Sequence, residues 1–90
     1  MSFLLDTNVL SELNAPQADA QVMAWFAQTE RRRLYTATIV LAELLYGAEK
    51  IAGTRKGLQL RRFVEGLLST VVEGRVLPLD EPAARVLGRL

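Results

Sequence analysis

The chain has 90 residues, is 50% hydrophobic, carries a formal net charge of +1 and contains neither cysteine nor histidine. A chain of this length forms one small domain, and its charge gives no general attraction to nucleic acid or to an anionic membrane. The missing residue types exclude disulfides, thiol nucleophiles and a histidine base, so a bound metal would need oxygen ligands, which Mg²⁺ and Mn²⁺ prefer. Neither a signal peptide nor an apolar run of membrane-spanning length occurs, which predicts a cytoplasmic protein without membrane contact.

Short apolar segments alternate with amphipathic segments from the N-terminus onward. Residues 2–5 are typical of a strand, and a short helical turn is expected to follow through Leu13. The next helix is expected to begin near Asp19, a favourable N-cap residue. The three cations of Arg31–Arg33 are expected to end that helix, because they complement its negative pole.

The middle of the chain repeats this order. Residues 34–37 predict a second strand, and Thr38 is a suitable N-cap for the helix that carries Glu43. After a turn at residues 52–54, a further helix is predicted, which Gly74 is expected to end. Its apolar residues follow helical spacing: Leu60, Phe63, Val64, Leu67, Leu68 and Val71.

The last segment predicts one more strand and one more helix. Residues 75–79 are typical of a strand weakened by Pro78, which cannot donate a hydrogen bond to a neighbouring strand. Residues 80–82 are a favourable helix start. The apolar stripe of that helix is Ala83, Val86, Leu87 and Leu90. This alternation predicts an α/β fold with a parallel sheet.

Three polar residues, Asp6, Thr7 and Asn8, directly follow the apolar run Phe3–Leu5. In an open α/β sheet, ligands bind outside the carboxyl ends of the strands. Asp6 is therefore a candidate site residue. The alternative is that Asp6 only caps the following helix, since Asp is common at that position.

Glu43 is the one charged residue in a long apolar stretch. Seven of the eight positions from Ile39 to Tyr46 are apolar, which predicts a helix buried on most sides. A carboxylate buried there would need a partner or a metal ion. The alternative is a solvated stripe, because Lys50 lies seven residues further on the same helical face.

Three segments resemble PIN-domain ribonucleases, and in particular the VapC/FitB-like toxins of bacterial type II toxin–antitoxin systems: FLLDTNVLSEL (3–13), TATIVLAELLYGAEK (36–50) and VLPLDEPAARVLGRL (76–90). The resemblance implies a three-layer αβα fold with a parallel sheet, of which about three strands and four to five helices are present. It assigns metal binding to the acid at the end of the first strand and to a Glu on the third helix, which are Asp6 and Glu43 here. The family's remaining acids come later than Leu90, so residues 1–90 are expected to form a single PIN-like domain that is truncated at its C-terminus.

The resemblance also implies a Mg²⁺-dependent endoribonuclease, with Mn²⁺ as a possible substitute, that a cognate antitoxin inhibits. The expected assembly is a homodimer or a toxin–antitoxin hetero-oligomer. A divalent ion stabilises charge on the attacking and leaving oxygens and activates water. Thr7 and Asn8 could hydrogen-bond a carboxylate, a bound water or a phosphate, and the Arg and Lys clusters could position the RNA backbone.

Asp80 is a further candidate ligand, because it too follows a predicted strand. Capping of the next helix is the simpler role for this residue. One alternative function stays open, a catalytically incomplete PIN fragment that binds an antitoxin or another partner. A response-regulator receiver is disfavoured, because the chain lacks the early acidic pair and the later Asp and Lys of that fold.

Overall fold

The computed structural model describes residues 1–88, with side chains through residue 85. In chain order its elements are β1 (Phe3–Leu4), α1 (Thr7–Asn14), α2 (Ala20–Gln28), the 3-10 turn η1 (Arg31–Arg33), β2 (Leu34–Ala37), α3 (Thr38–Lys50), α4 (Arg55–Gly66), the π-helical turn η2 (Leu67–Val71), β3 (Val76–Leu77) and α5 (Glu81–Gly88). The predicted α/β class is confirmed.

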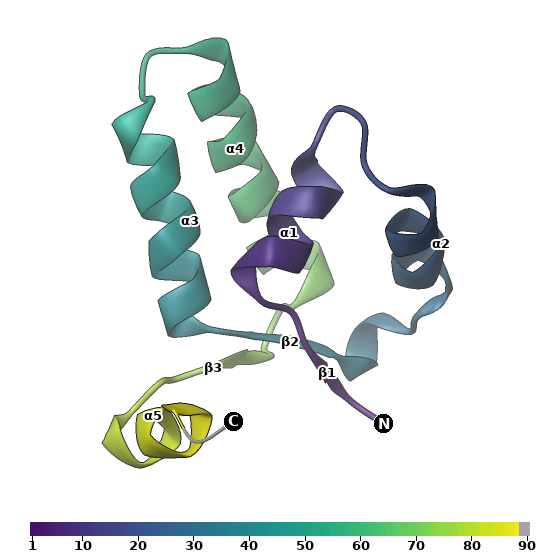
Figure 1. Ribbon diagram of the computed structural model, residues 1–90, viewed down its shortest axis with the longest axis vertical. Coiled ribbons are helices and arrows are strands. Elements are labelled where there is room, and N and C mark those ends of the chain that lie inside the picture. The colour runs from purple at the N-terminus through teal and green to yellow at the C-terminus, as the bar shows by residue number, and fades with distance from the viewer. Residues whose placement is uncertain (89–90) are drawn as a thin grey trace.

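The three strands form a parallel sheet in the order β1-β2-β3. Phe3 pairs with Leu34 at one edge of β2, and Ala37 pairs with Leu77 at the other. Helices α1 to α4 lie on one side of the strands, whereas α5 lies on the opposite side (Figure 1). Because all strands are parallel, the residues that follow β1, β2 and β3 emerge at the same edge of the sheet.

The core lies between the sheet and the helices α1, α3 and α4. Its largest fully buried side chains are Leu5, Leu10, Leu34, Val64, Val72 and Thr36. The central strand β2 is buried at three of its four positions, as expected for a parallel strand covered by helices. The hydroxyl of Thr36 donates to the carbonyl of Leu5 at 2.9 Å, which joins β1 to β2 inside the core.

Two predicted helix boundaries are wrong. Helix α2 ends at Gln28 rather than at Arg31–Arg33, which form the separate turn η1. Thr29 is extended, and both its backbone N–H (3.1 Å) and its hydroxyl (2.6 Å) donate to the carbonyl of Trp25 at the helix end. Thr38 is the first residue of α3 and not its N-cap, because β2 runs into α3 without a loop and the Thr38 hydroxyl accepts from Leu79 N at 3.1 Å.

The last third of the chain keeps its predicted order with different lengths. Helix α4 begins at Arg55, with Thr54 as its N-cap, and passes into a π turn before Val72. Strand β3 has only two residues and ends directly before Pro78. The predicted stripe residues Val86, Leu87 and Leu90 lie outside the side chains that the structure describes. Within residues 1–88, no helix has the length and apolar character needed to cross a membrane.

Candidate metal centre

Asp6 lies where β1 gives way to α1. Leu5 N still donates to the carbonyl of Tyr35 at 2.7 Å, which fixes the chain to β2 just before Asp6. Asp6 itself is extended and exposed, and its Oδ1 accepts from Val9 N at 2.9 Å as the N-cap of α1. This hydrogen bond holds the carboxylate at the sheet edge and does not use its second oxygen.

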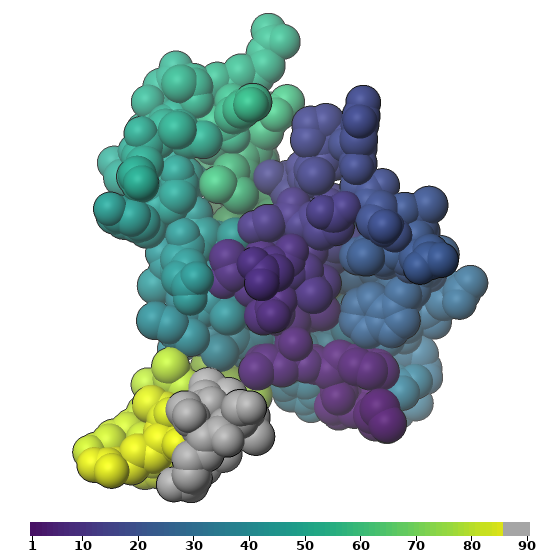
Figure 2. All heavy atoms as spheres, viewed as in Figure 1, coloured from purple at the N-terminus to yellow at the C-terminus, as the bar shows by residue number. Residues whose placement is uncertain are grey.

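Glu43 lies on α3, whose N-terminal part packs beside α1. The hydroxyl of Thr7 donates to Glu43 Oε2 at 3.1 Å, across 36 residues of sequence. Figure 2 shows the start of the chain and α1 (purple) at the surface next to α3 (teal), so this contact is formed on an open face of the molecule. The fold thus brings the Glu43 carboxylate to the residue that directly follows Asp6.

The burial predicted for Glu43 is wrong, because this side chain is exposed. Helix α3 buries Val40, Leu44 and Ala48 against the core and leaves Ile39 and Tyr46 with 44% and 67% of their surface exposed. The apolar run therefore covers two faces of α3, of which only one packs inside the domain. The alternative of a solvated stripe is therefore correct that Glu43 is exposed. On the same face, the ammonium of Lys50 lies 5.4 Å from the centre of the Tyr46 ring.

The donor set suits a hard, strongly hydrated cation. Asp6 and Glu43 each use one oxygen in the hydrogen bonds given above, and each keeps a second oxygen on an exposed side chain. Mg²⁺ is commonly held by one or two carboxylates, with water and substrate phosphate completing an octahedron. Residues 1–88 contain no cluster of three or more acidic, His or Cys side chains placed to hold a metal, so two carboxylates are what this part of the chain offers.

The other predicted residues divide into those near this pair and those elsewhere. Asn8 is exposed in the first turn of α1, next to Thr7. Asp80 caps α5, with its Oδ1 accepting from Ala83 N at 3.0 Å, which matches the simpler of its two roles. Glu12, a further acidic residue of α1, accepts from Asp19 N at 2.6 Å through its Oε1 and thereby links α1 to the start of α2.

A surface hollow of about 320 Å³ between α1 and α2 was not predicted from the sequence. Its walls are Val9, Gln21, Val22 and Trp25. Val9 belongs both to this hollow and to the cap of Asp6. The Trp25 ring meets the Phe3 ring edge-on, with centroids 5.1 Å apart, which fixes this wall against β1. Apolar residues on two separate helices form the hollow, and helical periodicity alone gives no sign that they meet.

The sequence of the chain matches the PIN domain family over residues 3–90, and the chain belongs to this family. Its similarity is to toxins of the FitB and VapC type. It is 34% identical to Toxin FitB of Neisseria gonorrhoeae over 97% of this chain and 63% of that protein. It is 41% identical to VapC ribonuclease Y4jK of Sinorhizobium fredii over 91% of this chain and 59% of that protein.

Solved structures give the same result for the fold. The structure of FitAB bound to an IR36 DNA fragment superposes with a TM-score of 0.78 at 34% identity, over 96% of this chain and 60% of that chain. The crystal structure of FitAcB from Neisseria gonorrhoeae gives a TM-score of 0.74 at 35% identity. The chain spans about three fifths of the length of these relatives.

Proposed function

We propose that this PIN domain belongs to a Mg²⁺-dependent endoribonuclease toxin that acts in the cytoplasm and is inhibited by a cognate antitoxin. In this proposal Asp6 and Glu43 hold the metal ion, and Mn²⁺ can replace Mg²⁺. The observation that carries it is the hydrogen bond from Thr7 to Glu43, 3.1 Å long, because it joins the helix carboxylate to the chain segment that carries Asp6. Membership of the PIN family and similarity to a VapC ribonuclease support the reaction class.

Each residue of the centre has a distinct task in this proposal. Asp6, held by its N-cap bond, presents one carboxylate oxygen from the sheet edge. Glu43 presents another from α3, and Thr7 fixes its orientation. A bound divalent ion would supply charge stabilisation at the phosphodiester and lower the pKa of a coordinated water. Both side chains are exposed, which favours access by an extended RNA strand.

Cleavage of a mixed-sequence single-stranded RNA by the purified chain, with Mg²⁺ and with EDTA, tests the reaction. We expect Mg²⁺-dependent cleavage that Asp6→Asn lowers by at least about 100-fold, the scale of loss when a charge-stabilising group is removed. Asn is as good an N-cap as Asp, so the fold is retained. Asp19→Asn is the matched control, since Asp19 caps α2 in the same way and lies away from the centre. Equal cleavage by wild type and Asp6→Asn would refute the assigned role of Asp6.

We further propose that the protein works in a homodimer or a toxin–antitoxin hetero-oligomer. The similar solved structures, which are those of FitAB and FitAcB, support this proposal. Exposed apolar side chains are available for such contacts on α3, where Ile39 and Tyr46 lie beside Glu43. Size-exclusion chromatography with light scattering, with and without a candidate antitoxin, tests it. A chain that stays monomeric in both samples would contradict this step.

A second candidate function is a partner-binding module that cleaves nothing. One observation favours it: Leu4 and Leu77 are each 47% exposed on the sheet face opposite α1 to α4. Together with Tyr35 they line a hollow of about 270 Å³. Tight antitoxin binding without any Mg²⁺ binding, both measured by calorimetry on the same chain, would favour this module over the nuclease.

A further inference from the structure

The positive charges of the chain divide into those that are already engaged and those that are free. Within residues 1–88, seven basic side chains contact an acid, a carbonyl or an aromatic ring: Arg31, Arg32, Arg33, Lys50, Arg61, Arg75 and Arg85. Arg32 is typical of this group, because its hydrogen bond to Glu30 lowers the pKa of that carboxyl and keeps the pair charged. The arginines of η1, which the sequence offers as an RNA contact, therefore each have a contact within the fold.

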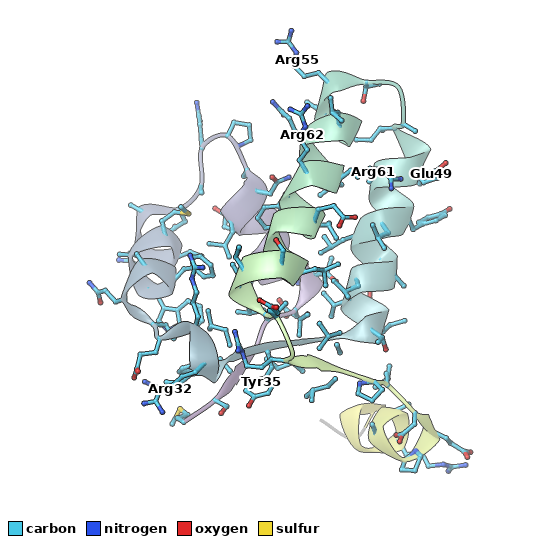
Figure 3. The ribbon with its side chains drawn as sticks, turned by 180° about the vertical axis from the view of Figure 1, so that it is seen from behind. Arg32, Tyr35, Glu49, Arg55, Arg61 and Arg62 are labelled. Atoms are coloured by element: carbon cyan, nitrogen blue, oxygen red, sulfur yellow. The ribbon has the colours of Figure 1, made fainter. Side chains whose placement is uncertain are left out.

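Three cations of the described part of the chain have no such contact, and all three belong to α4. These are Arg55, Lys56 and Arg62, each of them exposed. Figure 3 shows Arg55 and Arg62 projecting from α4 away from α3, whereas Arg61 points across to Glu49 of α3 at 3.0 Å. Glu65, one turn beyond Arg62, forms no ion pair with it. The free charge is thus gathered on one helix.

Arg55 and Lys56 occupy a position that their charge makes unfavourable. They are the first two residues of α4, where the helix carries its positive pole, and no acidic residue shares this turn. Thr54 already caps the helix through Gly57 N at 3.0 Å, so the cations are not needed to start it. Within the folded chain these charges lower stability slightly, and an external anion would reverse that effect.

We propose that Arg55, Lys56 and Arg62 form a contact surface for the phosphate backbone of RNA, separate from the candidate metal centre. This inference rests on the proposed function for its substrate class. Arg55 and Arg62 are seven residues apart and therefore share a helical face, with their Cα atoms about 10.5 Å apart along the axis. Guanidinium groups bind phosphate through two parallel hydrogen bonds, and such contacts position RNA without reading its sequence.

Binding of a labelled 20-nucleotide mixed-sequence RNA, measured by fluorescence anisotropy, tests the surface. The full chain carries Asp6→Asn throughout, so that the RNA stays intact. The test protein adds Arg55→Gln, Lys56→Gln and Arg62→Gln. The control adds Arg32→Gln, Arg61→Gln and Arg85→Gln, which remove the same charge from ion-paired positions. The melting temperature of each protein is measured in parallel.

We expect the test protein to lose about tenfold in RNA affinity at 0.1 M salt and the control to lose much less. The slope of log affinity against log salt should fall by about 2 in the test protein, because each lost phosphate contact removes about 0.7. Its melting temperature should be equal to or above that of the parent, since two cations leave the positive pole of α4. Lost affinity therefore cannot be ascribed to unfolding.

Equal RNA affinity in the test and control proteins would overturn the proposal. Tighter binding of poly-L-glutamate than of RNA to the parent, lost in the test protein, would overturn it too and assign the surface to an acidic protein partner. Failure of the proposed function would give a different result. The wild-type chain would then not cleave RNA with Mg²⁺, while the difference in RNA affinity between the test and control proteins would persist.

Discussion

Asp6 and Glu43 are held in different ways, and the difference decides which neighbours matter. Asp6 is fixed by its own helix cap, in which its Oδ1 accepts from Val9 N in the first turn of α1. Glu43 is an exposed side chain with several rotatable bonds, and ordering such a chain costs up to about 2 kcal/mol of entropy. Its one hydrogen bond, from Thr7, offsets part of that cost before any ion arrives. Thr7 is therefore a positioning residue for the proposed centre.

Thr7→Val should weaken divalent-ion binding by about tenfold, the usual scale for losing a hydrogen bond to a ligating group. Thr7→Ser keeps the hydroxyl and should restore most of the affinity. Mn²⁺ titration by calorimetry measures both, and thermal melting confirms that the two variants fold alike. Wild-type affinity in Thr7→Val would show that the Glu43 hydrogen bond has no positioning role.

The sequence is informative about Asp6 and misleading about Glu43. Three polar residues after an apolar run place Asp6 at a strand end, because both signals are local. The apolar neighbours of Glu43 predict burial, yet Ile39 and Tyr46 are exposed. Which faces of a helix are covered depends on elements distant in the chain, and periodicity does not contain that information. The partner Thr7 is 36 residues away and could not be assigned to Glu43 from the sequence.

The hairpin of α3 and α4 depends on one close approach between backbones. A Cβ atom on Gly57 would lie 2.3 Å from the carbonyl oxygen of Ile51 and 2.9 Å from its carbonyl carbon. Backbone atoms cannot move aside as a flexible side chain would, so glycine is required at this position. Gly57 lies in the first turn of α4, so this contact lies where α4 begins to pack along α3.

Gly57→Ala should lower the free energy of unfolding by about 1–3 kcal/mol, the range for an overpacked site. Gly66→Ala is the matched control, since nothing lies within 4 Å of the added methyl group. It should be neutral or stabilising by up to about 1 kcal/mol, because alanine favours a helix. Urea denaturation of the two variants decides the matter, and equal stabilities would contradict a tight contact at Gly57.

Helix starts are predicted better than helix ends, and the reason is chemical. Asp19 and Asp80 cap α2 and α5 through their own side chains, which are visible in the sequence. At the end of α2 the hydroxyl of Thr29 binds the carbonyl of Trp25, a role that Thr plays only in some contexts. Thr38 is the exception among the starts, because the loop-free entry from β2 leaves its hydroxyl for Leu79.

The whole molecule is a short parallel sheet with most of its helices on one face. The alternation of strands and helices along the sequence predicts the parallel sheet, but the strand order β1-β2-β3 comes only from the structure. The opposite sheet face carries α5 and leaves Leu4 and Leu77 exposed. That residues 1–90 are a domain truncated at its C-terminus stays a prediction.

Thr36, the buried polar residue of the described core, adds a side-chain hydrogen bond to the backbone pairing of the strands. Thr36→Val keeps the shape and leaves the Leu5 carbonyl oxygen without its donor, which should lower the free energy of unfolding by about 1–3 kcal/mol. Thr70→Val on the exposed turn η2 serves as control and should change it by less than about 0.5 kcal/mol. Chemical denaturation compares them. A negligible effect at Thr36 would mean that water replaces the hydroxyl.

Whether Asp6 and Glu43 bind one ion together is tested most directly by Mn²⁺ titration. The electron paramagnetic resonance signal of the free ion measures binding. Four proteins are compared: wild type, Asp6→Asn, Glu43→Gln and the double variant. We predict one ion per wild-type chain, about tenfold or greater weakening in each single variant, and little further loss in the double variant, because a shared site is already broken by one change. Equal binding by all four proteins, or independent losses that multiply in the double variant, would contradict the claim.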